Sequence, residues 1–456
     1  MNLNDTISAI STPVGEGGIS VIRLSGSKSF EITEKIFFKD TGGKKKINIS
    51  ETPSHTIHFG YIIDEVDLTD EVLISIFKKP NSYTGEDTIE ISSHGGVLVT
   101  QKILALTLKS GARYAEPGEF TKRAFLNKRL DLSQAEAVAD LIKAKTDSAL
   151  ESSLKQLEGS LSGYISGIRQ EIIDATSLIE LELDFSDEDL EFVSKDEFKK
   201  KIIGITEKLE MIISSYLSGK IIRDGVNLVI SGRTNSGKSS LFNQLLKSDR
   251  AIVSNISGTT RDYLQENIII NGILFNLTDT AGIRQSDDVI ETEGIKRSFQ
   301  KIEEADFVLY LVDSSETGKH ITEEVKYFKE NFKPEKSLLV FTKSDLKNHK
   351  GDEISISIFN EDSVQKLKQK ITDAVKENTK EKSGSEIILT NLRHKLCLDN
   401  VVSSLKQVTE SIDKKMSGEF ISVDLRNALS YLGEITGEVT NEEILNNIFS
   451  KFCIGK

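Results

Sequence analysis

The sequence predicts a multidomain protein with an α+β N-terminal domain, a discontinuous all-α domain, and an α/β domain inserted into the all-α part. Three observations predict this fold class. A glycine-rich motif at residues 232–239 lies between an apolar strand pattern and a helix pattern. Amphipathic helical segments precede and follow that region, and residues 1–125 mix short strand and helix patterns. We expect domain boundaries at residues 1–125, 126–218, 219–378 and 379–456, the second and fourth segments forming one helical domain.

The composition narrows the class of protein. The chain has 456 residues, enough for several domains, and its 38% of hydrophobic residues suffice for ordinary cores. No apolar run reaches the ~18–20 residues of a membrane span, and the first residues lack the features of a signal peptide. Cys397 and Cys453 are too far apart to suggest a zinc site or a disulfide framework. The net charge of −13 argues against broad, charge-driven binding of nucleic acid. We expect a cytoplasmic protein with no membrane partner.

The N-terminal region alternates short elements with turns. The expected strands and the expected helix lie at residues 19–24, 71–77, 88–92 and 97–109. Three turn-rich segments lie at 12–18, 83–87 and 94–96. Arg23 interrupts an apolar strand, which is unusual because charged residues are rarely buried.

The helical segments show start signals and one long apolar stripe. Ser133 with Glu136, and Thr440 with Glu443, match the capping box that begins helices. The stripe consists of Leu154, Leu157, Leu161, Ile165, Ile168 and Ile172. The three glycines that lie four apart predict close helix–helix contact: Gly159, Gly163 and Gly167. We expect the acidic run at 182–189 to be a solvated loop, since its carboxylates lack the spacing of an EF-hand. Further helices are expected at 195–218, 391–412, 422–432 and 441–452.

Residues 232–239 are a complete G-x-x-x-x-G-K-S phosphate loop. Its backbone N–H groups and the following helix N-terminus would bind phosphate. Lys238 would reach the β- and γ-phosphates, and the Ser239 hydroxyl would bind Mg²⁺. Thr260, in the segment Gly258-Thr259-Thr260, can add a second hydroxyl to that ion.

Later motifs follow in the order expected of a GTPase. Asp279-Thr280-Ala281-Gly282 follows a strand, where Asp279 can hold Mg²⁺ through water and Gly282 can sense the γ-phosphate. In Thr342-Lys343-Ser344-Asp345, the Asp345 carboxylate can accept the two N–H donors of guanine, a pair that adenine lacks. Thr342 stands where an Asn is usual, which would weaken one purine contact. The expected GTP contacts are Asn235, Ser236, Gly237, Lys238, Ser239, Ser240, Ser254, Asn255, Ile256, Ser257, Gly258, Thr259, Thr260, Asp279, Thr280, Ala281, Gly282, Thr342, Lys343, Asp345, Ser357 and Ile358.

Two residues bear on the GTPase subtype. Ras-like GTPases orient the attacking water with a Gln just after Asp-x-x-Gly, but this chain has Ile283 there. The nearby carboxylates are Asp287, Asp288, Glu291 and Glu293. Asn235 could ligate a cation with its amide oxygen, or it could simply be a loop residue that tolerates left-handed geometry.

Over its full length the sequence resembles the MnmE (TrmE) family of bacterial tRNA-modifying GTPases. The matching segments outside the phosphate loop are 5–7, 12–18, 23–26, 83–87, 94–96, 117–127, 130–137 and the terminal Phe452-Cys453-Ile454-Gly455-Lys456. The resemblance implies an N-terminal domain that dimerises and binds a tetrahydrofolate of the 5,10-methylene or 5-formyl type. It also implies a homodimer that joins an FAD-dependent MnmG-type partner in a heterotetramer, with FAD only on the partner.

The resemblance further implies an activity. The family adds a carboxymethylaminomethyl or aminomethyl group to C5 of uridine 34 in certain tRNAs, with folate as the one-carbon source. By motif position, Arg23, Glu90, Arg129 and Lys456 would contact folate. Cys453 falls on the family's required terminal Cys, and the rival reading is a buried packing residue at a helix end.

In the GTPase domain, the resemblance implies K⁺ activation. The expected K⁺ ligands are Asn235, Ser254, Ile256 and Thr259, and the Mg²⁺ ligands are Ser239 and Thr260. Glu291 matches the family's water-orienting Glu, so the expected catalytic residues are Glu291, Lys238 and Cys453.

Two other functions fit the GTPase motifs. A GTP-dependent switch in ribosome assembly would need no modification chemistry, and a dimeric structural GTPase would leave Arg23, Glu90 and Lys456 without a role. Candidate tRNA contacts are Lys122, Arg123, Lys128 and Arg129.

Overall fold

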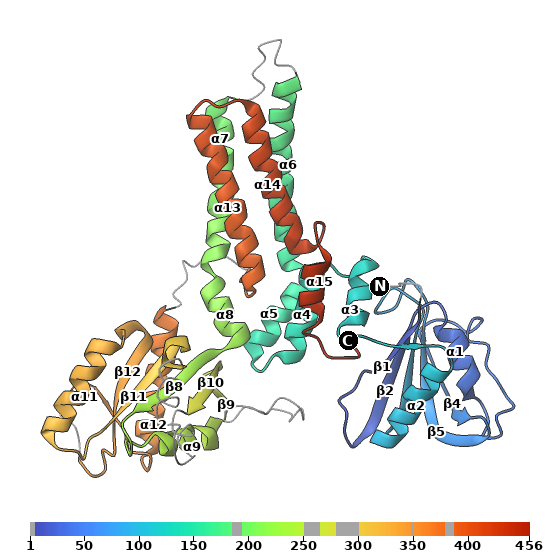
Figure 1. Ribbon diagram of the computed structural model, residues 1–456, viewed down its shortest axis with the longest axis horizontal. Helices are drawn as coiled ribbons and strands as arrows, with labels where there is room; N and C mark the ends of the chain where they lie inside the picture. The colour runs from blue at the N-terminus through green and yellow to red at the C-terminus, as the bar shows by residue number, and fades with distance from the viewer. Residues whose placement is uncertain are drawn as a thin grey trace, which may run out of the picture. The chain divides into compact units, whose positions relative to one another are not determined.

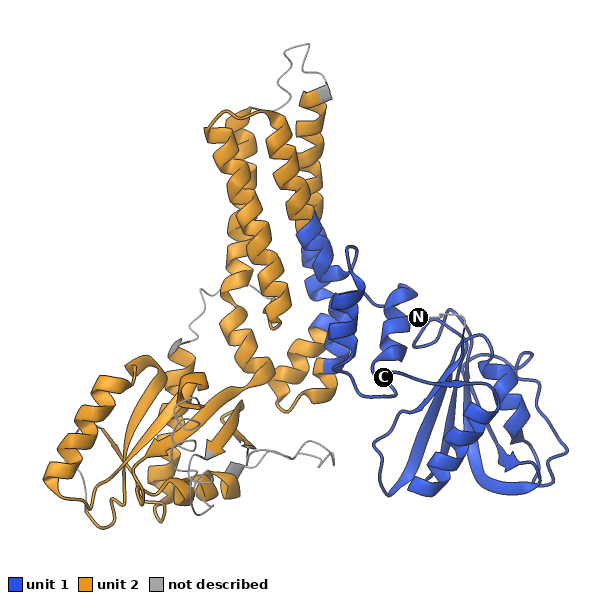
Figure 2. Cartoon of the chain, viewed as in Figure 1, with its two compact units in different colours: residues 1–139, 156–167, 430–456 blue, residues 140–155, 168–429 orange. Residues whose placement is uncertain are grey.

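The computed structural model describes residues 5–184, 194–249, 265–279, 301–347, 351, 353–378 and 387–456. The chain divides into two compact units, coloured separately in Figure 2. Unit 1 comprises residues 1–139, 156–167 and 430–456, and unit 2 comprises residues 140–155 and 168–429.

Unit 1 is built on a seven-stranded sheet of order β3-β4-β5-β6-β2-β1-β7. Its strands are β1 (Ile7–Ile10), β2 (Gly17–Ser25), β3 (Phe37–Phe38), β4 (Thr56–Asp64), β5 (Asp67–Phe77), β6 (Thr88–Gly95) and β7 (Arg113–Tyr114). Helices α1 (Ser29–Ile36) and α2 (Val97–Lys109) contact each other and cover one face of the sheet (Figure 1). The expected strands and the helix at 97–109 are confirmed.

The opposite face of this sheet leaves apolar side chains exposed. Side chains alternate along a strand, so one face of β4 and β5 is buried under the helices and the other points away from them. Phe59 and Leu73 are cross-strand partners on this open face and are 52% and 44% exposed. Ile57, two residues before Phe59, is 66% exposed.

Three short helices complete unit 1 beside the sheet. They are α3 (Glu119–Leu126), the start of α4 (Leu132–Lys143) and α15 (Glu442–Phe449). Leu132 and Ala135 of α4 share a buried cluster with Leu445, Phe449 and Phe452. The residues just after α15 are therefore held by a core.

The two expected capping boxes are wrong in position. Helix α4 begins at Leu132, and the reciprocal bonds join Gln134 N to Asp131 Oδ1 at 2.9 Å and Asp131 N to Gln134 Oε1 at 3.0 Å. Helix α15 is capped by Asn441, whose side chain accepts from Ile444 N at 2.8 Å. Asp131 lies two residues before the expected Ser133, and Asn441 lies one residue after the expected Thr440. Both are residue types that favour the N-cap position.

The expected close contact at the spaced glycines is also wrong. Gly159 has φ +93 and separates α5 (Asp147–Leu157) from α6 (Ser160–Asp184). A Cβ added at Gly163 or Gly167 would meet no atom within 4 Å among the described residues. These two glycines face open space on α6, because the apolar stripe of that helix lies on another side.

Unit 2 contains a six-stranded sheet of order β13-β12-β11-β8-β10-β9. The strands are β8 (Val226–Gly232), β9 (Gln265–Ile270), β10 (Ile273–Asp279), β11 (Phe307–Asp313), β12 (Ser337–Thr342) and β13 (Ile354–Ser355). All neighbouring pairs are parallel except β9–β10, an antiparallel hairpin in which Asn271 and Gly272 both have positive φ, as is typical of Asn-Gly turns.

Helices cover both faces of this sheet. α9 (Lys238–Asp249) and α12 (Glu361–Asn378) pack on the face that carries Leu228, Leu309 and Leu311. α11 (Gly318–Asn331) packs on the other face, where Tyr310 and Val312 of β11 point. The described part is therefore the α/β fold predicted for the inserted region, and β8 ends at the phosphate loop.

Four long helices that lie wholly or mostly in unit 2 run side by side (Figure 1). They are α6, α7 (Lys195–Ser214), α13 (Leu392–Asp413) and α14 (Gly418–Thr436). α13 packs along α7, and Lys406 of α13 pairs with Glu210 of α7 at 2.7 Å. A short helix, α8 (Tyr216–Asp224), leads from α7 to β8. This packing supports the expected union of the helices before and after the α/β region, whose boundaries stay a prediction.

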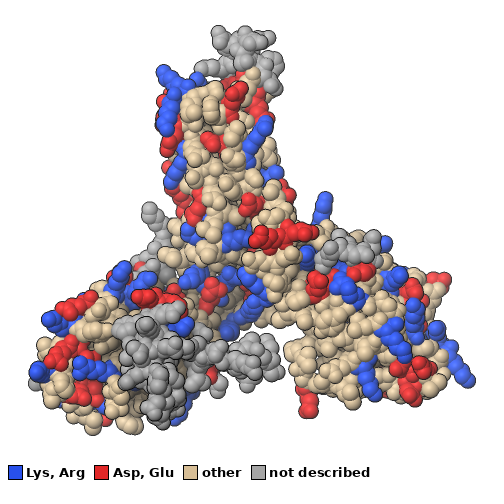
Figure 3. Space-filling view, viewed as in Figure 1, with Lys and Arg blue, Asp and Glu red and all other residues tan. Residues whose placement is uncertain are grey.

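Charge is mixed on the face of the protein shown in Figure 3, where Lys and Arg are interspersed with Asp and Glu over the long helices. Within the described residues, no helix combines the length and the apolar character needed to cross a membrane.

Candidate functional site

The phosphate loop connects β8 to α9, as expected. Gly232 has φ +139, and a Cβ there would lie 2.4 Å from the Leu311 carbonyl oxygen, so only glycine fits. Gly237 has φ +92. The Lys238 ammonium donates to the carbonyl oxygens of Gly232 and Arg233 at 3.0 and 2.6 Å. Ser239 and Ser240, in the first turn of α9, are exposed and accessible to a ligand.

Asn235 lies at the tip of a tight turn in this loop. Ser236 N donates to the Arg233 carbonyl oxygen at 3.2 Å, which closes the turn. Asn235 has φ +66, which is the left-handed geometry expected if Asn235 is a loop residue that tolerates this conformation. Its side chain is exposed. The turn therefore explains why an Asn occupies this position, and it leaves the side-chain amide of Asn235 exposed to solvent.

Thr342 connects the base-recognition segment to the phosphate loop. Its hydroxyl is buried and donates to the Ser236 carbonyl oxygen at 2.8 Å. Three residues later, Asp345 is exposed at the end of β12, where a guanine-binding carboxylate is expected. Lys343 has φ +56, and its ammonium pairs with Asp313. Burial alone would raise the pKa of Asp313, but the hydrogen bonds from Lys343 and Ser315, together with the charge of Lys343, lower it overall.

The loosely matching base loop at Ser357 and Ile358 lies beside this segment. Ser344 N donates to the Ile356 carbonyl oxygen at 3.1 Å, and Ile356 N donates to the Phe341 carbonyl oxygen at 2.7 Å. Strand β13 before it is short and ends at Ser355. It ends because the Ser357 backbone turns to bond the Ser363 hydroxyl instead of a strand.

A buried carboxylate that the sequence analysis missed lies behind the phosphate loop. Glu324 of α11 has a side chain only 9% exposed, and its Oε1 lies 2.5 Å from Arg233 Nε. Its Oε2 accepts from the Tyr310 hydroxyl at 2.7 Å. A cavity of about 60 Å³ separates the loop from α11 at this point, with Thr234, Ser236 and Val312 in its lining. A single Glu in a helix carries no sequence signal that it will be buried and paired with a residue of the phosphate loop.

Several expected contacts lie outside the described residues. Asp279 ends β10, directly before them. The positions outside are Ser254, Asn255, Ile256, Ser257, Gly258, Thr259, Thr260, Thr280, Ala281, Gly282, Ile283 and Glu291, together with the acidic run from 185 onward. Among the described residues, no group of three or more His, Cys, Asp or Glu is placed to hold a metal ion.

A second polar site in unit 1 brings together the expected folate residues. Arg23 of β2 and Glu90 of β6 are register partners, and Arg23 Nη2 lies 2.8 Å from Glu90 Oε1. The guanidinium also lies over the rings of Tyr83 and Phe120, at 5.2 and 5.6 Å from their centroids. Arg23 Nη1 is buried and has no hydrogen-bond partner within the described chain. A buried donor without a protein partner is expected where a ligand with oxygen atoms supplies the acceptor.

The end of the chain reaches the same site. Gly455 has φ +94, and the Ser11 hydroxyl donates to its carbonyl oxygen at 3.1 Å. Lys456 is half-buried, and burial together with the charge of Arg23 lowers its pKa, while Glu90 acts in the opposite direction. These electrostatic effects require that Lys456 lie close to Arg23 and Glu90.

Arg129 and Cys453 lie at the edges of this site. Burial raises the pKa of the Tyr83 hydroxyl, and the nearby charges of Arg23 and Arg129 oppose that shift. Cys453 is exposed, so the interpretation as a buried packing residue is wrong. Its carbonyl oxygen accepts from Gly118 N at 3.4 Å, which ties the tail to the start of α3.

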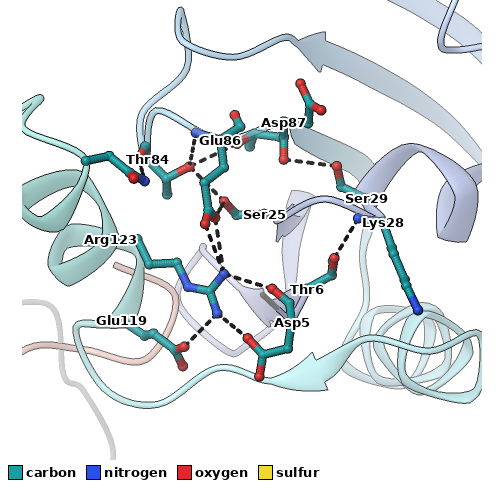
Figure 4. A network of polar contacts seen from close by, with 12 residues as sticks. Asp5, Thr6, Ser25, Lys28, Ser29, Thr84, Glu86, Asp87, Glu119 and Arg123 are labelled. Atoms are coloured by element: carbon teal, nitrogen blue, oxygen red, sulfur yellow. Dashed lines mark hydrogen bonds and ion pairs between the residues drawn. The ribbon is translucent and has the colours of Figure 1, made fainter. Parts of the chain in front are cut away.

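The motif residues around Arg123 form a buried ion-pair network (Figure 4). Arg123 is 0% exposed and contacts the carboxylates of Asp5, Glu86 and Glu119 at 2.6, 3.2 and 3.0 Å. Ser25 and Thr84 complete the network through hydroxyl bonds. Arg123 therefore cannot contact tRNA, and this part of the expectation is wrong, whereas Lys128 and Arg129 are exposed.

Sequence comparisons agree over the whole chain. The profile described as GTP-binding protein TrmE N-terminus matches residues 6–129, and the profile of the MnmE helical domain matches residues 132–453. The chain is 41% identical to the tRNA modification GTPase MnmE of Christiangramia forsetii, with 100% of both chains covered. It is 43% identical to the protein of that name from Chlorobaculum tepidum, covering 99% of this chain and 97% of the relative. It is 40% identical to the Streptococcus sanguinis protein, with 99% of each covered.

Proposed function

The chain belongs to the MnmE family of tRNA modification GTPases, and we propose that it is a K⁺-activated GTP hydrolase that acts in modification of the wobble uridine of tRNA. With an FAD-dependent MnmG-type partner, it adds a carboxymethylaminomethyl or aminomethyl group to C5 of uridine 34. A tetrahydrofolate supplies the one-carbon unit. The observation that carries this proposal is that one chain combines a GTPase site with the convergent cluster of Arg23, Glu90 and Lys456.

The GTPase site offers a group for each task. The phosphate loop binds the phosphates through backbone N–H groups and Lys238, and Ser239 with Thr260 holds Mg²⁺. Asp345 accepts from guanine. Asn235, exposed on its turn, contributes an amide oxygen to K⁺, with Ser254, Ile256 and Thr259 as the other ligands. The bound cation would offset charge in the transition state, as an arginine finger does elsewhere. Glu291 orients the attacking water.

The residues in unit 1 fit a folate in chemical terms. A pterin offers amino and N–H donors that suit the Glu90 carboxylate, and a folate tail offers carboxylates that suit Arg23, Arg129 and Lys456. The buried Nη1 of Arg23 has no partner among the described residues, so it could donate a hydrogen bond to an acceptor atom of the ligand. Cys453, exposed three residues before Lys456, lies next to this site and is proposed to take part in the modification.

A homodimer is proposed through the open face of the unit 1 sheet. Ile57, Phe59 and Leu73 form an exposed apolar group on neighbouring strands, and such a group is stabilised by burial in an interface.

The cellular compartment in which we expect the protein to act is the cytoplasm.

The test of this function is analysis of wobble uridines in tRNA from cells that lack the protein. We expect the substituent at C5 of uridine 34 to be lost, and a plasmid copy of the gene to restore it. Normal modification together with a defect in ribosome assembly would instead support a GTP-dependent assembly switch.

We predict that Asn235→Ala abolishes stimulation of GTP hydrolysis by K⁺ but spares GDP binding. The amide oxygen is lost, while the backbone that binds phosphate keeps its fold. The measurement compares hydrolysis in KCl and NaCl at equal ionic strength, with GDP affinity measured in parallel. Unchanged stimulation in the variant would remove Asn235 from the cation site.

A further inference from the structure

The turn that presents Asn235 is anchored at both of its ends. At one end, the Ser236 carbonyl oxygen accepts from the buried Thr342 hydroxyl at 2.8 Å. At the other end, the Arg233 side chain pairs with Glu324 of α11. Asn235 lies between the two anchors in the left-handed conformation. The position of its amide therefore depends on both.

Glu324 is itself held in one orientation. Its side chain is 9% exposed, and its second oxygen accepts from the Tyr310 hydroxyl. Burial and the neighbouring carboxylate of Glu324 raise the pKa of Tyr310, so this hydroxyl stays protonated and remains a donor. With one oxygen fixed by Tyr310, the other is directed at the Arg233 guanidinium.

A cavity lies on this side of the phosphate loop. The cavity of about 60 Å³ lies between the phosphate loop, the end of β11 and α11, and both Arg233 and Glu324 line it. The Ser236 hydroxyl in its wall is buried and has no partner within the described residues. Because packing contacts do not cross a cavity, the ion pair that spans this space adds a directional constraint on the loop.

The anchored residue also touches the catalytic lysine. The Arg233 carbonyl oxygen accepts from both Ser236 N and Lys238 Nζ. A shift of Arg233 would therefore move the peptide that closes the turn and the carbonyl that orients Lys238.

We propose that Glu324 is a positioning residue of the GTPase site, which acts through Arg233 to hold Asn235 where it can ligate K⁺. This inference rests on the proposed K⁺ role of Asn235. Both carboxylate oxygens of Glu324 are engaged by protein groups, Arg233 and Tyr310. Its effect is to preset the turn, because a ligand group must be held to within about 0.5 Å for its site to work.

The test uses the full-length Glu324→Ala, Arg233→Ala and doubly substituted proteins. The thermal unfolding midpoint is measured with Mg²⁺ and a non-hydrolysable GTP analogue while K⁺ replaces Na⁺ at constant ionic strength. The K⁺ concentration for half-maximal GTP hydrolysis is measured in parallel. We expect Glu324→Ala to raise the half-effective K⁺ concentration about five-fold in both assays, the size of a partly exposed ion pair. GDP affinity should change less than about two-fold.

The double variant shows whether the two residues act as one unit. If Glu324 acts through Arg233, the double variant resembles Arg233→Ala alone, and the two effects do not add. The matched control is Glu330→Ala, an exposed residue of the same helix that pairs only with Lys326 at 3.8 Å among the described residues. This control should keep the wild-type K⁺ response.

The outcomes separate the two levels of the proposal. A wild-type protein without any K⁺ response contradicts the proposed function itself. A wild-type response that Glu324→Ala leaves at the same K⁺ concentration overturns the role of Glu324 alone. If Glu324→Ala fails to bind GDP, the near-isosteric Glu324→Gln decides, since it keeps the size of the side chain and one acceptor oxygen but removes the charge that pairs with Arg233. A smaller shift in the same direction supports the role, and an unchanged K⁺ concentration overturns it.

Discussion

At the residue scale, single glycines and single charges decide how the sites are built. Gly455 shows this for the tail. A Cβ at this position would lie 2.2 Å from the Ile10 carbonyl oxygen, and its φ of +94 disfavours any other residue. The penultimate glycine therefore allows the tail to pass β1 closely and to bring Lys456 to Arg23 and Glu90.

We predict that Gly455→Ala weakens binding of 5-formyltetrahydrofolate by at least about ten-fold, because strain of ~1–3 kcal/mol displaces the tail. The thermal unfolding midpoint should change less than the folate affinity, since the substitution lies beyond Phe452, the last residue of the buried cluster. Calorimetric titration measures the affinity. Gly163→Ala is the control, as its Cβ would meet no described atom within 4 Å. Unaltered folate affinity in Gly455→Ala would contradict a role for the tail.

Arg123 is the second decisive residue. Burial alone would raise the pKa values of Asp5 and Glu119, but hydrogen bonds and charges from Arg113 and Arg123 hold both below their ordinary values. A carboxylate with a lowered pKa in the folded state stabilises the fold above its unfolded pKa. That stabilisation is lost as the pH falls through the folded value.

We predict that the wild-type protein loses stability as the pH falls from about 5 to about 3. Arg123→Met should lower the free energy of unfolding by about 3–5 kcal/mol at neutral pH, because it removes a buried cation from three carboxylates, of which Asp5 and Glu119 still pair with Arg113. The variant should lose less stability on acidification, since protonation then relieves repulsion. Denaturant unfolding at several pH values measures both effects. Lys109→Met, at an exposed position, is the control. Equal acid sensitivity in the two proteins would argue against the network.

At the scale of elements, helix starts depend on which side chain reaches the free N–H groups. The patterns Ser133-x-x-Glu136 and Thr440-x-x-Glu443 predict capping boxes, yet Asp131 and Asn441 cap the helices. Ser133 instead falls inside α4, where its hydroxyl is buried without a described partner. A local pattern finds the helix but locates its first residue only to within a turn.

We predict that Asp131→Ala destabilises the protein by about 0.5–2 kcal/mol, the usual effect of removing an N-cap. Ser133→Ala should be neutral, because no described hydrogen bond is lost. Chemical denaturation of the two variants under the same conditions makes the comparison. The reverse order, with Ser133→Ala the more harmful, would restore the capping box expected from sequence.

At the scale of the whole molecule, the open face of the unit 1 sheet needs a partner. A helical layer covers only one face, and the apolar group of Ile57, Phe59 and Leu73 remains on the other. The Arg23–Glu90 pair lies on the neighbouring strands β2 and β6 of the same sheet. A dimer formed there would place the proposed folate site near the interface.

We predict that Phe59→Asp converts the proposed homodimer to a monomer, because burying an unpaired carboxylate in an apolar interface is unfavourable. Analytical ultracentrifugation measures the mass in solution. Leu98→Asp, on α2 and 67% exposed, should leave the dimer intact. Persistence of the dimer in Phe59→Asp would place the interface elsewhere.

The sequence by itself determined the features that depend on neighbouring residues. These are the phosphate loop between β8 and α9, the Asn-Gly hairpin, helix α2, and the order of the GTPase motifs. Each follows from local backbone geometry or from period-two and period-3.6 patterns, which a single segment contains. Family resemblance supplied roles for Arg23, Glu90 and Lys456.

Only the tertiary structure decided which distant side chains meet. Lys456 lies close to Arg23 although most of the sequence separates them. Arg123 is buried among carboxylates from three segments. Glu324 pairs with Arg233 across a cavity. Long-range contacts depend on how whole elements pack, and no local pattern records that packing. For the same reason the exposed thiol of Cys453 and the open surface around Gly163 and Gly167 could be found only in the folded chain.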